Sequence, residues 1–218
     1  MTTIVKAGPT DSPKKPTRFV LGSCAAAIAL LPISAAAHPG IAGHTRSFTH
    51  GFTHPFSGID HLLAMIAVGL FSAHLGGRAL WVVPVSFISV IALAGIAGMA
   101  GVALPFTGFG IALSLIVLGL AVALEINVPT FVASAVVGFF AVFHGYAHGA
   151  EMPASLSGLS YGLGFIGATL LLCAMGVGLG VASGQTGEVY SRRTVQIGGA
   201  TISAVGVALL ALRRTAEL

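Results

Sequence analysis

The hydrophobic residues of this chain are gathered into six long apolar runs, separated by short polar or glycine-containing connections. A helix needs about 20 mostly apolar residues to cross the ~30 Å hydrocarbon core of a bilayer. The runs are close to that length, and no connection is long enough to form a soluble catalytic domain. We therefore predict six transmembrane helices, over residues 57–75, 79–99, 107–126, 130–148, 156–182 and 194–212.

The composition agrees with this pattern, because 56% of the residues are hydrophobic and only 7% are charged. A soluble protein of 218 residues would need a far larger polar surface. The predicted fold class is therefore all-α, in a polytopic protein embedded in the lipid bilayer. The chain has no basic patch suited to nucleic acid and no Walker motif for a nucleotide.

A seventh, shorter apolar run lies near the N-terminus and has the pattern of a cleavable signal peptide. A basic flank at residues 14–18 precedes the apolar residues 19–33, and three alanines at 35–37 form an A-x-A cleavage pattern before His38. The alternative is an uncleaved first helix, although the run is short for a membrane span.

Cleavage there predicts three parts: a signal peptide at 1–37, a periplasmic histidine-bearing segment at 38–56, and a six-helix membrane domain at 57–218. We expect a location in a bacterial inner membrane, with the mature N-terminus in the periplasm. Six crossings then return the C-terminus to the periplasm. The arginines near the ends of the spans are balanced between the two sides, so they do not fix the orientation.

Ionisable side chains are costly inside a bilayer and usually mark a functional site. Here they form two clusters, one with Asp60 and His61 at the start of the first span and one at the end of the fourth span. In a helix, residues spaced i, i+4 and i+7 share one face. That spacing relates the members of the second cluster, which are His144, His148 and Glu151.

The two clusters are expected to meet, because the first span enters from the periplasm and the fourth span returns there. His54 precedes Pro55, which favours an extended residue, and we expect His54 to fold back toward Asp60 or His61. Imidazole and carboxylate groups without a thiolate suit nickel, zinc, copper or iron(II). The predicted metal ligands are His54, Asp60, His61, His144, His148 and Glu151. The competing interpretation is a set of interfacial polar residues and helix caps.

Further histidines lie on either side of these clusters. His38, His44 and His50 precede the first span and are candidates for gathering metal, although a merely solvated polar segment would look the same. His74 and Glu125 are expected near the cytoplasmic ends of the first and third spans, where they are candidates for an exit path.

Both clusters resemble motifs of the HupE/UreJ family of hydrogenase- and urease-associated nickel permeases. His54, Asp60 and His61 match H-x5-D-H, and the residues from Phe143 to Glu151 match F-H-G-x-A-H-G-x-E. The resemblance implies secondary uptake of nickel to supply a nickel enzyme. It leaves cobalt open as the ion, and it implies a transiently bound metal substrate rather than a permanent cofactor.

A second function remains open from the residues alone. The same side chains are suited to holding a catalytic metal in an intramembrane hydrolase or hydroxylase. The chain has no H-E-x-x-H motif and no evident separate acid, base or oxyanion group. A non-enzymatic permease is therefore the favoured interpretation, and the sequence leaves open whether it forms a homo-oligomer.

Overall fold

The computed structural model describes residues 41–185 and 189–216, and the regular structure in these ranges is helical. This confirms the predicted all-α fold class. The signal peptide predicted at residues 1–37 lies outside the described residues, as does His38. The seven described helices are α2 (Ile41–Ser57), α3 (Ile59–Leu75), α4 (Ala79–Met99), α5 (Thr107–Ala123), α6 (Thr130–Ala150), α7 (Gly158–Gln185) and α8 (Val189–Ala216).

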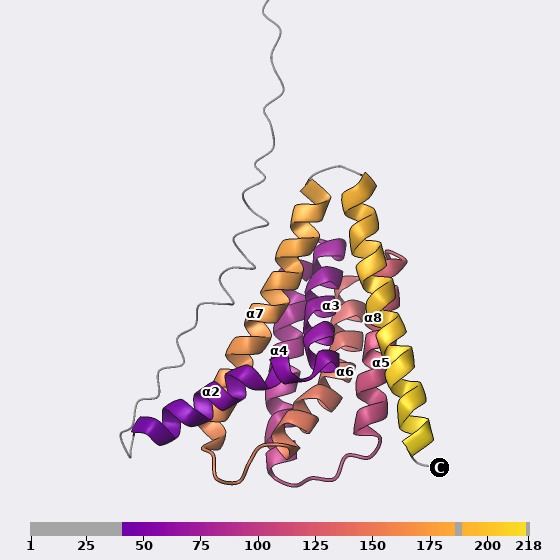
Figure 1. Ribbon diagram of the computed structural model, residues 1–218. Coiled ribbons are helices and arrows are strands. Elements are labelled where there is room, and N and C mark those ends of the chain that lie inside the picture. The colour runs from indigo at the N-terminus through magenta and orange to yellow at the C-terminus, as the bar shows by residue number, and fades with distance from the viewer. Residues whose placement is uncertain (1–40, 186–188, 217–218) are drawn as a thin grey trace, which may run out of the picture. The chain divides into compact units, whose positions relative to one another are not determined.

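Each of the six predicted membrane helices corresponds to one helix from α3 to α8 (Figure 1). The bounds of α4 agree with the prediction at both ends, whereas α5 ends at Ala123 instead of Ile126. Glu125 has a left-handed backbone conformation, with φ at 51°. Such a residue does not continue a right-handed helix, so the chain turns there.

Four of the described helices, α4, α6, α7 and α8, are long and apolar enough to cross a membrane. The bent pair α2 and α3 counts as a fifth candidate span, and α5 is a shorter apolar helix of 17 residues. The chain is therefore a multi-pass membrane protein. Its helices present to the outside many large apolar side chains, as a lipid-facing surface requires. Examples are Trp81, Leu93, Phe131, Leu159 and Ile197.

Residues 41–57 differ from the expectation, because they form a helix that continues through Pro55. His54 is therefore helical, and the extended conformation expected for it, folding back toward Asp60 or His61, is wrong. Pro55 has no N–H to donate to the carbonyl oxygen of Gly51, so one backbone hydrogen bond is missing near the end of α2, and the helix stops two residues later at Ser57. The extended backbone of Gly58, at φ −107° and ψ 115°, then starts α3, and the two helices meet at 84°.

The buried core is centred on α3, which packs against α7, α5 and α4. Met65 and Val68 of α3 are fully buried with Phe87 of α4 and Leu115 of α5. The most extensive helix pairs are α4 with α6 and α5 with α8. Because α3 and α6 run in opposite directions, the start of α3 and the end of α6 lie at the same end of the bundle.

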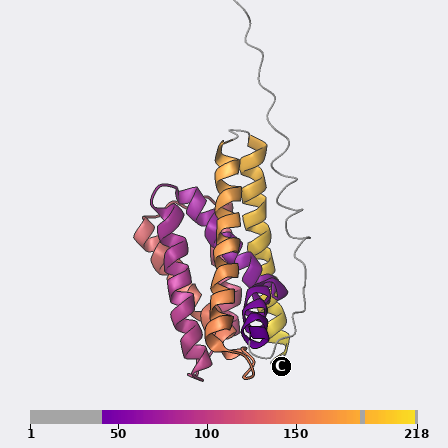
Figure 2. The ribbon, with the colours of Figure 1, turned by 90° about the vertical axis from the view of Figure 1, so that its left-hand side faces the viewer.

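Helix α2 lies against the N-terminal half of α7 in both views, and it is seen nearly end-on in Figure 2. The two backbones approach closely at glycines: a Cβ on Gly51 would lie 2.0 Å from the carbonyl oxygen of Tyr161. A Cβ on Gly164 would likewise lie 2.1 Å from the carbonyl oxygen of Phe48. Helix α2 is thus a packed element of the fold.

Candidate metal centre

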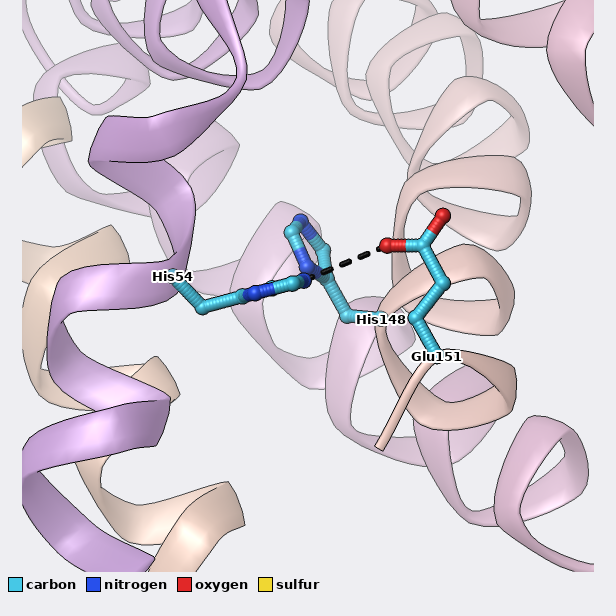
Figure 3. Close-up of side chains that lie close together, drawn as sticks. All are labelled: His54, His148 and Glu151. Carbon is cyan, nitrogen blue, oxygen red and sulfur yellow. Dashed lines mark hydrogen bonds and ion pairs between the residues drawn. The ribbon is translucent and has the colours of Figure 1, made fainter. Parts of the chain in front are cut away.

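The outermost group of candidate ligands joins α2 to the end of α6. His54 of α2, His148 of α6 and Glu151 after α6 each offer a ligand atom, and these atoms lie within 4.8 Å of one another. The side chains converge from the two sides (Figure 3), and His54 Nε2 donates to Glu151 Oε2 at 3.2 Å. Two ligands held ~2.1 Å from one ion are at most ~4.2 Å apart. A small inward movement of these side chains would therefore complete a shared site.

The remaining imidazoles continue from this group into the bundle. The ring centre of His148 lies 4.8 Å from that of His54 and 4.1 Å from that of His61. The ring of His61 lies 5.1 Å from that of His144. Four histidines from α2, α3 and α6 therefore form a continuous column, and the two sequence motifs lie together as predicted.

The column is exposed at its outer end and buried at the three inner histidines, of which His61 is 8% exposed. The side chain of Glu151 is 59% exposed and that of His54 is 20% exposed. His148 is only 2% exposed, and His144 is fully buried. The column thus begins at a solvated end and finishes in the interior of the bundle. That is the arrangement expected of a path for an ion that must be desolvated.

A sequence model described as HupE / UreJ protein matches residues 26–209 of this chain. The chain belongs to the HupE/UreJ family. It is 42% identical over 184 residues to Protein HupE from Rhizobium leguminosarum bv. viciae, a match that covers 84% of this chain and 94% of that protein. No solved structure matches the chain. The resemblance indicated by the two motifs is confirmed.

In this HupE/UreJ family member, Asp60 is bonded to its neighbour and is not part of the outer group. Asp60 Oδ1 accepts hydrogen bonds from the backbone N–H of His61 at 2.9 Å and from His61 Nδ1 at 2.8 Å. Because a carboxylate only accepts, the proton of neutral His61 is on Nδ1. The lone pair of His61 is therefore on Nε2.

Several nitrogen atoms of the column are buried and have no hydrogen-bond partner among the described residues. They are His61 Nε2, His144 Nδ1 and both ring nitrogens of His148. An unpaired buried polar atom costs roughly 1–3 kcal/mol. Each neutral ring has one lone pair, which a bound cation would satisfy, so the concentration of these rings in one place favours a site for a ligand over ordinary packing.

The N-terminal histidines of α2 reach the same region. His44 Nδ1 hydrogen-bonds Ser160 Oγ of α7 at 3.2 Å. The ring of His50 lies 6.1 Å from that of His54 and 6.0 Å from that of Tyr161. Because α2 is packed on α7, His50 lies next to the column, although its side chain is exposed.

The two predicted exit residues lie at the other end of the bundle. His74 is 13 residues after His61, which is about 20 Å along a helix, and its Nε2 has no partner among the described residues. Glu125 is already paired, because Arg192 donates to both of its carboxylate oxygens. Hydrogen bonding to Arg192, with a smaller contribution from nearby His74, lowers the pKa of Glu125 below its usual value.

Sequence reasoning missed several residues that surround the column. Phe165 packs on His148 with ring centres 4.1 Å apart, and Tyr161 donates to the carbonyl oxygen of His148 at 3.4 Å. Ser114 of α5 contacts His144. None of the three belongs to either motif. Polar residues inside an otherwise apolar run were the only available signal, and that signal applies to Ser114 and Tyr161.

Proposed function

We propose that this HupE/UreJ family member takes up a divalent transition metal, nickel first among the candidates, across the bacterial inner membrane. The observation that carries the proposal is the column of four imidazoles that leads from an exposed carboxylate to a fully buried ring. Its donors are nitrogen and oxygen, which suit nickel, and cobalt is the nearest competitor. The imported metal would supply a nickel enzyme such as hydrogenase or urease.

In this proposal the outer group receives the ion. His54, His148 and Glu151 together provide two imidazoles and one carboxylate, and Glu151 is exposed enough to meet a hydrated cation. The ion would replace the hydrogen bond between His54 and Glu151, and the Nε2 proton of His54 would leave to the solvent at this exposed end. His44 and His50 extend this histidine-rich surface along α2, and we include them, with His38, as residues that gather metal near the entrance.

His148 would then pass the ion inward. Both of its ring nitrogens lack partners among the described residues, and its ring lies between those of His54 and His61. His61 and His144 would form the inner position. A permease must bind strongly enough to remove water from the ion and weakly enough to release it. Successive sites with a shared ligand meet both demands.

Asp60 is proposed to orient His61 and not to bind the ion itself. Its oxygen holds His61 Nδ1–H and leaves Nε2 for the metal, the arrangement in which an outer carboxylate orients a histidine ligand and raises its basicity. This refines the initial expectation that Asp60 contacts the ion itself.

The proposed topology has six crossings, by the bent pair α2–α3 and by α4 to α8, after removal of residues 1–37. The histidine column then faces the periplasm, as does the mature N-terminus. His74 and Glu125 mark the cytoplasmic end. Because Glu125 is paired with Arg192, that pair must separate before Glu125 can bind an ion leaving the protein.

The test is uptake of radioactive nickel by cells that lack their own nickel permease and express this chain. We expect His148→Ala and Glu151→Ala each to reduce uptake at least tenfold, with unchanged amounts of protein in the membrane. Thr53→Ala, which alters an exposed residue of α2, is the control and should transport normally. Unchanged uptake in both site variants would refute the proposal. If unlabelled cobalt competed more strongly than unlabelled nickel, cobalt would replace nickel as the proposed substrate.

A further inference from the structure

Ser114 lies in the middle of α5 and is completely buried. Its Oγ has two polar neighbours: the carbonyl oxygen of Ile111, at 2.7 Å, and His144 Nε2, at 2.8 Å. Ile111 is one turn earlier in the same helix, whereas His144 is at the inner end of the histidine column, on α6. Ser114 thus contacts the most buried imidazole of the site from a helix that carries neither motif.

The direction in which Ser114 donates its single hydroxyl proton determines which ring nitrogen of His144 is protonated. Two oxygens 2.7 Å apart need a proton between them, and a carbonyl oxygen only accepts, so Ser114 donates to Ile111. Its remaining contact must then be an accepted bond, in which His144 donates from Nε2–H. A doubly protonated ring would bury a second N–H at Nδ1, for which the described residues offer no acceptor. His144 is therefore neutral, with its lone pair on Nδ1.

We propose that Ser114 is a positioning residue that fixes the Nε2–H tautomer of His144 and so makes Nδ1 its metal-binding nitrogen. The inference rests on the proposed function for its metal. His144 Nδ1 is buried and unpartnered among the described residues, as a nitrogen awaiting a cation would be. Without the Ser114 oxygen, His144 is free to place its proton on either nitrogen and to turn its ring, and the lone pair no longer has one defined direction.

The opposite arrangement holds at His61, where Asp60 retains the proton on Nδ1 and leaves Nε2 for the metal. The two inner histidines thus present different nitrogens, each selected by a different neighbour. Outer partners that fix a histidine ligand in this way typically change metal affinity by about 10- to 100-fold when removed.

The first measurement is nitrogen NMR of the purified, metal-free full-length protein with 15N-labelled histidine, in which His144 is assigned from its loss in His144→Ala. We expect a protonated Nε2 and an unprotonated Nδ1 in the wild type, and a mixture of both tautomers in Ser114→Ala. Ser72→Ala is the matched control, because Ser72 is also fully buried and, among the described residues, its hydroxyl bonds only to the carbonyl oxygen of Val68 in its own helix. It should leave the His144 signals unchanged.

The second measurement is nickel affinity, by calorimetry on the same samples. Ser114→Ala should weaken binding by about 10-fold or more, Ser114→Thr should retain most of the affinity because it keeps the hydroxyl, and Ser72→Ala should bind normally. A wild-type His144 protonated on Nδ1, or equal affinities for Ser114→Ala and Ser72→Ala, would overturn the inference. Absence of nickel uptake, together with a tautomer that shifts in Ser114→Ala, would refute the proposed function and leave the Ser114 assignment standing.

Discussion

At the scale of single residues, the neighbours of each imidazole determine what it can do. His54 meets a carboxylate from another helix, His61 meets the carboxylate next to it in the chain, and His148 meets no hydrogen-bonding side chain at its ring nitrogens among the described residues. Histidines of identical chemistry therefore have different parts in the proposed path. His148, whose two nitrogens are unpartnered, is best suited to exchange an ion between the outer and inner positions.

The part assigned to Asp60 leads to a prediction at this scale. Asp60→Asn keeps an oxygen that can accept from His61 Nδ1–H, whereas Asp60→Ala leaves that donor without its acceptor. We expect Asp60→Ala to weaken nickel binding by about 10- to 100-fold and Asp60→Asn to retain part of that affinity, as measured by calorimetry on purified protein. Equal and complete loss of binding in both variants would instead indicate that the carboxylate contacts the metal directly.

At the scale of elements, the orientation of α2 decides whether the outer group exists. His54 and Glu151 are 97 residues apart in the chain, and they meet because α2 leaves α3 at 84° and packs on α7. Backbone contact at glycine allows that packing, and hydrogen bonds reinforce it: Ser47 Oγ accepts from the backbone N–H of Ser157 at 3.1 Å.

This packing is tested by Gly51→Ala. The added methyl group would lie 2.0 Å from the carbonyl oxygen of Tyr161, and a backbone atom cannot move aside as a flexible side chain can. Helix α2 must therefore shift away from α7 and carry His54 away from Glu151. We expect nickel uptake at low external metal to fall several-fold.

The control is Gly43→Ala in the same helix, where an added Cβ meets nothing within 4 Å. Its uptake should equal that of the wild type. Cysteines introduced at positions 54 and 151, in a background with Cys173→Ala, report the movement directly. They should cross-link readily with Gly51 intact and poorly in Gly51→Ala, and equal cross-linking would show that α2 tolerates the methyl group in place.

At the scale of the whole molecule, the candidate metal ligands and the candidate exit residues form two groups at opposite ends of the described bundle. The histidine column lies where α3 begins and α6 ends, and the pair of Glu125 with Arg192 lies beyond the end of α5, beside His74. A largely apolar bundle connects them. An ion entering at the column must therefore pass between helices to reach the second end, and this separation supports opposite sides of the membrane for the two groups.

Topology provides the prediction at this scale. With residues 1–37 removed and six crossings, the mature chain should begin at His38, and a reporter fused after Leu218 should be active in the periplasm. Alkaline phosphatase, active only in the periplasm, and green fluorescent protein, fluorescent only in the cytoplasm, give opposite readouts at the same fusion point. A retained presequence with a cytoplasmic C-terminus would reverse the proposed direction of the column.

The sequence by itself determined the class of protein and most of its helices, because both depend on local properties. Apolar runs of sufficient length define helices in a bilayer wherever they occur, and α4 begins and ends where its run does. Spacing along one helix likewise placed His144 and His148 on one face. The opposite directions of the first and fourth spans were enough to predict that the two motifs meet.

Only the tertiary structure decided the conformation of His54 and the hydrogen-bond partners of the histidines, because both depend on contacts between residues far apart in the chain. The local rule for a residue before proline gave the wrong conformation for His54, since packing of α2 on α7 keeps residues 41–57 helical. The oxygen that reaches His144 Nε2 comes from Ser114, 30 residues earlier and on another helix. Which nitrogen a histidine offers is set by such partners, and no spacing within either motif contains that information.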